Sequence, residues 1–267
     1  MANCNNLFQD YHNEISIGSA KNTKMKESKA GLRKRIKKWF NENHPDYLPQ
    51  FYIQGSYKMK IAIRTAQDIC DLDDGIYFFR EPDVAATTLK EWVRQAVNGY
   101  TATAPENRKK CVRSIFVNDY EIDHPIYYKI DGQEYKIAVK DKGWEDSDSK
   151  AVVDWFVSNK DKEGRLARII KDIKGWADNQ NFKMPSGLAL TILATNAKNK
   201  IILNERDDIS IKDILKEIKK ALAISFSCVV PATPYDDLFD GYDPSRKEKF
   251  LDALDNFIKD ADEALKL

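Results

Sequence analysis

The sequence lacks several features that would place a protein in a class at once. Its 267 residues include four cysteines and three histidines, with no Cys-x-x-Cys pair and no metal-ligand spacing among the histidines. That argues against a zinc knuckle or a disulfide framework, and we expect free core thiols. Basic and acidic residues balance at 43 to 42, so no global field grips nucleic acid. No apolar run approaches the ~18 to 20 residues of a membrane span.

Targeting and low-complexity segments are missing as well. The N-terminal residues have neither the basic nor the apolar region of a signal peptide, so we expect a cytoplasmic protein without membrane contact. There are no internal repeats. With 42% hydrophobic residues, the chain can bury a large core, as one large domain or as two intimate lobes.

The first half of the chain is predicted to be a mixed sheet with few helices. Apolar residues at helical spacing predict a basic helix near 22–43, which His44-Pro45 ends. Asp131-Gly132 predicts a hairpin turn. Strands are expected over 51–53, around Asp71 and Asp73, and over 114–117, 120–129 and 133–140, with a helix over 86–98 and a loop over 98–108.

The second half is predicted to be helical. Ser210 is a candidate cap for one helix, and Asp243-Pro244 opens another. Helices are expected over 150–156, 165–178, 187–195, 211–224 and 244–265. The chain therefore reads as an α+β protein, with a catalytic sheet lobe over residues 1–145, a helical lobe over 146–267, and a cleft between the lobes.

Two carboxylates carry the strongest chemical signal. Asp71 and Asp73 lie two residues apart in an apolar run, so on a strand they point to the same face. Carboxylates side by side raise each other's pKa unless a cation neutralises them, and Mg²⁺ with substrate phosphates is the usual one. A solvated strand edge is the alternative for such a pair. The apolar surroundings favour a metal site.

A third carboxylate and a tight turn complete the pattern. Two-metal phosphoryl chemistry needs a further acid from a neighbouring strand, and Asp123 is the candidate. Pro125 restricts that strand to an edge, a bulge or a strand end. Gly55 lets the backbone approach a ligand closely, and Ser56 offers a hydroxyl to phosphate, although the pair alone would be an ordinary turn. Together these residues point to nucleotidyl transfer.

Three motifs resemble one known family. Gln-Gly-Ser-Tyr at 54–57, Asp-Leu-Asp-Asp-Gly-Ile-Tyr at 71–77 and Ile-Asp-His-Pro-Ile-Tyr at 122–127 are similar to the bacterial cGAS/DncV-like nucleotidyltransferases, the CD-NTases of CBASS anti-phage defence. Stretches at 143–148, 173–177 and 184–191 continue the likeness, which runs from about Phe51 to Pro234 and is closest to the cyclic GMP-AMP synthase-like branch.

The resemblance implies a polymerase-β-like fold with a helical second lobe, and Mg²⁺-dependent joining of nucleoside triphosphates. Two Mg²⁺ ions are expected, with Mn²⁺ as an alternative, and ATP and GTP as substrates. The product would be a cyclic di- or trinucleotide, similar to cyclic GMP-AMP, that activates a separate effector. The protein would be a monomer, with regulatory partners encoded in the same operon.

The resemblance also implies roles for individual residues. Asp71, Asp73 and Asp123 would be catalytic and hold the metals. The turn at Gly55 with Gln54 and Ser56 would meet the donor phosphates. The remaining nucleotide contacts would come from Lys110, Ser147, Lys174 and Ser186.

The residues themselves support two of these roles in part. Lys174 lies at the margin of an apolar helical stripe, from which it reaches a cleft or snorkels to solvent, while Lys171 lies further round toward solvent. Ser186 follows Pro185 near a helix start, which is either an anion site or a plain cap. The chain departs from the family at Lys60-Ile61, where small residues are common, so the loop shape there is open.

Three alternatives remain at the level of the sequence. The enzyme could be a linear oligonucleotide synthase or tag RNA or a small molecule, since the catalytic half would look alike. It could be a nucleotide-binding relic, which the intact acids argue against. The basic helix could bind nucleic acid, as the animal relatives do, although its charges are also those of a solvated face. His124 follows Asp123 on a strand, so we interpret it as structural.

Overall fold

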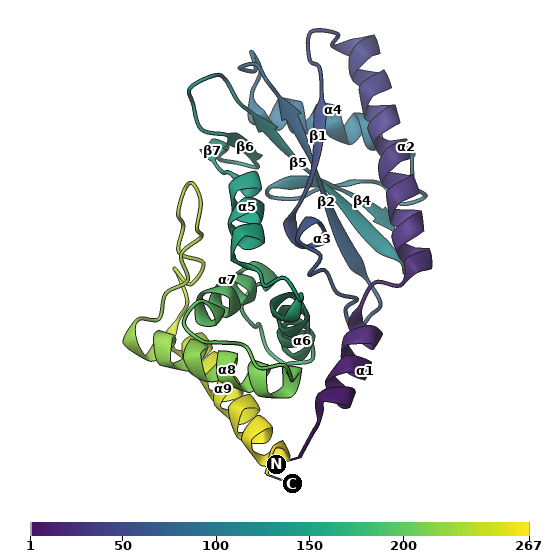
Figure 1. Cartoon of the computed structure of the whole chain (residues 1–267). Coiled ribbons are helices and arrows are strands. Elements are labelled where there is room, and N and C mark those ends of the chain that lie inside the picture. Colours follow the sequence, from purple (N-terminus) through teal and green to yellow (C-terminus); the bar gives the residue numbers. More distant parts are fainter. Residues whose placement is uncertain (1, 267) are drawn as a thin grey trace. The chain divides into compact units, whose positions relative to one another are not determined.

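The computed structural model describes residues 2–266. The chain forms two compact units (Figure 1). The sheet unit comprises Ile17–Val153 with Ala232–Pro234. The helical unit comprises the chain up to Ser16, Asp154–Pro231, and the chain from Tyr235 on.

These units differ from the predicted division at residue 145. Helix α1 (Asn5–Ile15), which the sequence did not predict, belongs to the helical unit because it packs against α6 (Arg165–Asp178). A β-carbon at Gly175 would overlap the Tyr11 hydroxyl, so this glycine permits the close approach. The two units are joined through α5 (Ser149–Asn159), which begins in the first and ends in the second.

The described part of the sheet unit contains one seven-stranded sheet. Its main path runs β1-β2-β5-β4-β3, and β6 pairs with both β5 and β7. Strands β2 and β5 are parallel and the other pairs are antiparallel. The strands are β1 (Gln50–Gln54), β2 (Cys70–Phe78), β3 (Glu106–Asn107), β4 (Cys111–Phe116), β5 (Tyr120–Tyr128), β6 (Lys136–Val139) and β7 (Gly143–Asp146).

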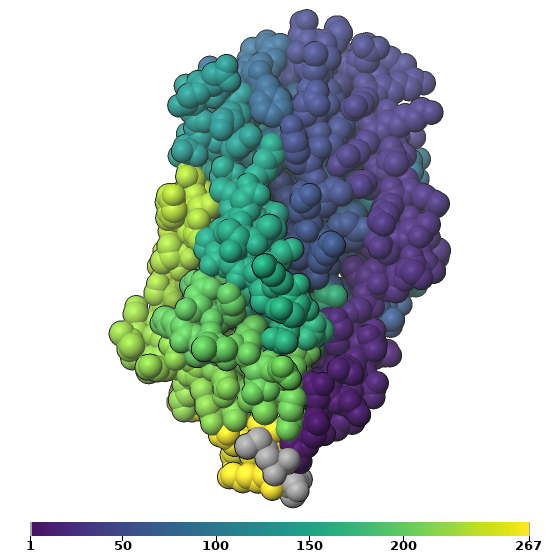
Figure 2. Space-filling view, in the orientation of Figure 1, coloured from purple at the N-terminus to yellow at the C-terminus, as the bar shows by residue number. Residues whose placement is uncertain are grey.

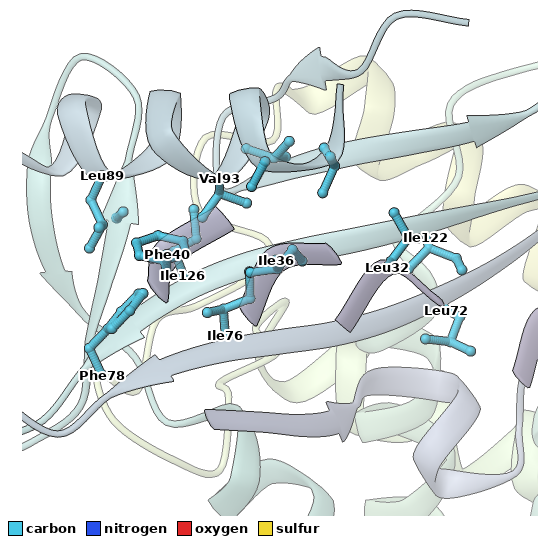
Figure 3. Close-up of a cluster of buried hydrophobic side chains, with 14 of the residues drawn as sticks. Leu32, Ile36, Phe40, Leu72, Ile76, Phe78, Leu89, Val93, Ile122 and Ile126 are labelled. Carbon is cyan, nitrogen blue, oxygen red and sulfur yellow. The ribbon is translucent and has the colours of Figure 1, made fainter. Parts of the chain in front are cut away.

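One face of this sheet is covered by α2 (Ser19–Asn43) and α4 (Ala86–Val97). Alternate residues of β2 and β5 meet apolar side chains of both helices there, as Figure 3 shows. The labelled core residues are Leu32, Ile36, Phe40, Leu72, Ile76, Phe78, Leu89, Val93, Ile122 and Ile126. This period-two burial fixes which side chains of β2 and β5 face the other way.

The basic helix predicted near 22–43 is confirmed as α2, and its charges are divided. Arg33 and Lys21 turn toward carboxylates of the sheet unit. Lys26, Lys34 and Lys37 are exposed. The surface of the N-terminal part of the chain, which includes α2, is purple in Figure 2. A solvated basic face is therefore present, with an apolar edge beneath it.

The sequence predicts Pro125 at an edge, a bulge or a strand end, and this is wrong, because the proline lies within a central strand. Strand β5 lies between β2 and β4, and its pairing with β2 skips from Asp73–Asp123 to Ile76–Ile126. Proline has no backbone N–H to give to the ladder, which explains the interruption. His124 lies in the same gap, fully buried, with its Nδ1 3.2 Å from the carbonyl of Asp74.

The helical unit contains the end of α5, α6, α7 (Gly187–Lys198), α8 (Asp207–Ile224) and α9 (Pro244–Ala264). The predicted cap of α9 is confirmed, because Asp243 Oδ1 accepts the Arg246 N–H at 2.8 Å. The predicted cap of α8 is wrong: the helix begins at Asp207, and Ser210 lies buried within it.

Two expectations from composition can be compared with the described chain. All four cysteines are free; Cys70 and Cys228 are buried, and Cys4 and Cys111 are half-buried. Over residues 2–266, no helix has both the length and the apolar character required to cross a membrane.

Candidate active site

The parallel register of β2 and β5 aligns two pairs of acids. Asp73 lies beside Asp123, and Asp71 lies beside Glu121. All four point away from the core face because they alternate with Leu72 and its buried counterparts. The predicted trio therefore shares one face of two adjacent strands. Glu121 is a fourth acid that sequence reasoning missed, although its place two residues before Asp123 was a usable signal.

Strand β4 adds a cation to this face. Arg113 pairs with Asp123 in the β4–β5 ladder, and its Nε and Nη2 each donate to one carboxylate oxygen at 2.8 Å. Its Nη1 also forms an ion pair with Glu121. The exposed fractions of Arg113, Glu121 and Asp123 are 17%, 19% and 13%, so the cluster is largely buried. The hydrogen bond to Asp123 raises the pKa of Arg113. Sequence reasoning missed Arg113 too.

The sequence predicts that the carboxylates surround metal ions, whereas in the structure one of them, Asp123, binds Arg113. Within residues 2–266, no three acid, histidine or cysteine side chains converge as a ready metal site. Both oxygens of Asp123 are turned to Arg113. Burial raises the pKa of Glu121, and the negative charges of Asp71 and Asp123 add to the increase. The donor set itself, carboxylate oxygens on adjacent strands, fits a divalent cation such as Mg²⁺.

The predicted Gly-Ser turn lies against this face. Gly55 opens α3 (Gly55–Met59) directly after β1, with φ at +62°. A β-carbon at this position would overlap Asp73 Oδ2, so only glycine fits here. Ser56 follows, and its carbonyl accepts the Ile61 N–H at 2.9 Å. Lys60 and Ile61, where the sequence departs from the family, therefore lie in a loop closed by this hydrogen bond. The backbone of Lys60 is left-handed there, and Ile61 is buried.

The structure gives Gln54 a different environment from the phosphate contact that the sequence predicts. Its side chain is 4% exposed, and both ends of its amide are bonded to tyrosines. Ser147 is half-buried and donates its backbone N–H to the Tyr135 carbonyl at 2.9 Å. Lys110 is exposed in the bend before β4. The nucleotide contacts predicted for these three residues stay predictions.

The helical unit brings its two predicted residues together. Ser186 caps α7, where its Oγ accepts the Ala189 N–H at 3.2 Å. The side chain of Lys174 reaches the same helix start, because its Cε lies 2.9 Å from where a β-carbon of Gly187 would be. A cation and a helix N-terminus together suit an anion.

Two expectations about single side chains have clear outcomes. Lys171 does not point to solvent: it is half-buried, donates to Ser16 Oγ at 3.2 Å, and burial lowers its pKa. The structural interpretation of His124 agrees with its position, since it is buried on the face opposite Asp123 and burial lowers its pKa.

Comparison with known proteins adds sequence evidence. Residues 49–127 match the family model of the nucleotidyltransferase domain of DncV-like cyclic GMP-AMP synthases. A cyclic GMP-AMP synthase of Escherichia albertii is 33% identical over 196 residues. The match covers 67% of this chain but 42% of that relative, so the chain spans less than half the length of the curated protein it matches.

Solved structures share the fold over almost the whole chain. Vibrio cholerae DncV, a cyclic AMP-GMP synthase, superposes with a TM-score of 0.81 at 16% identity, covering 96% of this chain and 88% of that one. Escherichia coli DncV in a 3′-deoxy GTP bound form gives 0.81 at 17% identity, covering 97% and 90%. The expected fold is confirmed, and the chain belongs to the bacterial cGAS/DncV-like nucleotidyltransferases.

Proposed function

We propose that this protein joins nucleoside triphosphates into a cyclic dinucleotide similar to cyclic GMP-AMP. The family and the sequence relative support this activity, and related structures hold GTP, ATP or a linear pppA(3′,5′)pG intermediate. ATP and GTP are accordingly the proposed substrates. As the resemblance implies, the product would activate a separate effector in anti-phage defence.

The observation that carries the proposal is the acidic face of β2 and β5 with the glycine turn packed on it. Four carboxylates occupy two alternate register pairs, which are neighbours on this face, and Gly55 packs against Asp73. Such crowding of like charge costs stability unless cations are bound. An ordinary structural strand has no need of it, whereas phosphoryl transfer does.

Asp71, Asp73 and Asp123 are the proposed metal ligands, and Glu121 lies beside them. Bound Mg²⁺ would orient an attacking ribose hydroxyl and balance the charge of the triphosphate. Gly55 allows close approach of the backbone to the donor phosphates, and Ser56 offers its hydroxyl. Arg113 donates one hydrogen bond to each oxygen of Asp123, each of which keeps a further lone pair with which it would hold a metal, and the guanidinium would also suit substrate phosphate.

The helical unit would supply the remaining grip on the triphosphate. Lys174 and Ser186 meet at the start of α7, where a positive charge, a hydroxyl and the backbone N–H groups of a helix N-terminus would suit phosphate oxygens. Lys110 and Ser147 are proposed as further nucleotide contacts on the strength of the family resemblance. None of these residues needs to act as a covalent nucleophile.

The test is product analysis with a matched control. The wild-type protein, incubated with the four nucleoside triphosphates and Mg²⁺, should give a phosphatase-resistant product whose mass identifies a cyclic dinucleotide. Asp71→Ala combined with Asp73→Ala should abolish it and leave the circular dichroism spectrum unchanged. Asp131→Ala combined with Glu134→Ala, in the exposed β5–β6 turn, should leave product formation intact.

Three outcomes would contradict the proposal. A product that phosphatase degrades would identify a linear oligonucleotide synthase. Turnover by the Asp71, Asp73 double variant would refute the carboxylate mechanism. Nucleotide binding by the wild-type protein without any turnover would favour a binding module.

A further inference from the structure

The Gln54 side chain ends in a buried set of hydroxyl groups. Tyr77 Oη donates to Gln54 Oε1 at 2.7 Å, and Gln54 Nε2 donates to Tyr127 Oη at 3.0 Å. The Tyr127 hydroxyl also shares a 2.7 Å hydrogen bond with Ser149 Oγ at the start of α5. We call Gln54, Tyr77, Tyr127 and Ser149 the tyrosine network.

The network is buried and its two rings are stacked. The rings of Tyr77 and Tyr127 stack with centroids 4.6 Å apart and planes 10° apart, and each side chain is 1% exposed. Gly75 leaves the space for it, because a β-carbon there would lie 2.7 Å from both Gln54 Oε1 and Tyr77 Cε2. A buried amide whose partners are removed costs roughly 1–3 kcal/mol, so the end of β1 is firmly held.

The network lies on the same sheet face as the acids. Gln54 is the register partner of Asp73, and the next residue, Gly55, packs on the Asp73 carboxylate. The Gln54 backbone precedes the Gly55–Ser56 turn directly, and its side-chain hydrogen bonds hold Gln54 in addition to its pairing within the sheet. The amide carbonyl and one amide N–H of Gln54 are used within the network, so the orientation of the side chain is set by the two tyrosines.

We infer that the tyrosine network positions the Gly55–Ser56 turn against Asp73, and that Gln54 serves the reaction as a positioning residue through this network. The inference rests on the proposed function for its effect on turnover. The local mechanical link between the network and the turn is independent of that function.

The experiment compares Tyr77→Phe, Tyr127→Phe, their combination, and Gln54→Leu. Each tyrosine variant keeps the stacked ring and removes only a hydroxyl. Tyr120→Phe is the matched control: Tyr120 lies on the same strand β5, is 3% exposed, and shares a 2.8 Å hydrogen bond with Ser28 Oγ, but on the opposite face. Both readouts are taken on the full chain: amide hydrogen exchange of residues 55–61, and kcat and KM for the triphosphates.

The expected result is a shared defect in the network variants. Amide exchange over residues 55–61 should accelerate about tenfold or more in the Tyr77, Tyr127 double variant and not in Tyr120→Phe. Turnover should fall about tenfold in kcat with KM nearly unchanged, and adding Gln54→Leu to the double variant should cost little more, because the residues act as a unit.

Two results would overturn the inference. One is unchanged exchange over residues 55–61 in the tyrosine variants. The other is a raised KM in Gln54→Leu alone with normal kinetics in both tyrosine variants, which is the pattern of a direct phosphate contact. If the wild-type protein gives no cyclic product, the proposed function fails while the exchange measurement still decides the positional claim. If Gln54→Leu does not fold, the single tyrosine variants carry the test.

Discussion

The two faces of strands β2 and β5 are built from alternate residues of the same segments, yet they differ completely in chemistry. On one face Leu72, Ile76, Ile122 and Ile126 are fully buried under α2 and α4. On the other face the same strands carry the acids, followed by the stacked tyrosines. Even-numbered residues of these strand segments face the core, and odd-numbered residues carry the acids and the tyrosines. We therefore expect a substitution on the core face to reduce stability, and a substitution of the neighbouring acid to reduce the proposed activity.

Two polar residues break this rule on the core face. Asp74 and His124 are fully buried there. Arg33 holds Asp74 through a bidentate contact, and His124 is placed 3.2 Å from the Asp74 carbonyl, where burial lowers its pKa and favours the neutral ring. A buried charge is tolerated only when it is paired. The third acid of the Asp-Leu-Asp-Asp motif therefore anchors α2 and does not belong to the acidic face.

The largest effect should come from substituting the core face. Leu72→Ala removes a fully buried side chain between α2 and the sheet, and should lower the free energy of unfolding by about 2–5 kcal/mol. The adjacent Asp73→Asn should leave that free energy unchanged or raise it, and should abolish product. Chemical denaturation of both variants checks this. Equal destabilisation by the two would show that the faces are not independent.

Arg113 tests whether the acidic face needs its cation. Arg113→Met leaves Glu121 and Asp123 without their shared partner, and should cost roughly 1–3 kcal/mol near neutral pH. Millimolar Mg²⁺ should then raise the melting temperature of the variant more than that of the wild type, because the ion can replace the guanidinium. Arg94→Met, in a half-buried pair with Glu91 on the same helix, should change little and show no added response to Mg²⁺. An identical Mg²⁺ response in all three proteins would contradict the prediction.

Two glycines with left-handed backbones allow the effect of backbone strain to be distinguished from the effect of a steric clash with Asp73. Gly55 and Gly132 have φ of +62° and +77°, but only Gly55 has a neighbour where a β-carbon would be. Gly132→Ala should cost about 1 kcal/mol of stability and leave turnover unchanged. Gly55→Ala should cost more and reduce turnover severely, since the methyl group displaces Asp73. Equal turnover in the two variants would show that the Gly55–Ser56 turn has no role in the reaction.

The spacing of apolar residues and the residues that start or end helices were enough to predict much of this architecture from the sequence. Apolar spacing predicted α2 and α6, and Asp243-Pro244 predicted the start of α9. Asp71 and Asp73 could be placed on one face because alternation is a local property. The association of α1 with the helical unit and the start of α8 depend on tertiary contacts, so local rules missed them.

The site was harder because it depends on register. Asp123 follows from its motif, but its alignment with Asp73, and that of Arg113 with Asp123, are set by which residues pair across strands. No spacing within one segment reveals that Arg113 and Glu121 join the acids. Gln54 shows the same limit: its motif suggests a phosphate contact, while two tyrosines far along the chain give its amide other partners.

The smallest expected effect concerns Glu121 on the acidic face, whose contribution to stability should depend on pH. Burial, with repulsion from Asp71 and Asp123, raises the pKa of Glu121 above its usual 4.5 despite the opposing charge of Arg113. The folded protein therefore holds this proton more tightly than the unfolded chain does, so the carboxyl stabilises the fold below pH 4.5 and loses that contribution as the pH rises through the raised value. Glu121→Gln cannot titrate, so its stability relative to the wild type should improve as the pH rises from about 4 to 7, by less than about 1 kcal/mol.

Denaturation at several pH values measures this slope, with the exposed Glu134→Gln as the control. A relative stability of Glu121→Gln that falls over this interval would mean that the pairing of Glu121 with Arg113 outweighs its burial, so that the acidic face is already neutralised by its own arginine.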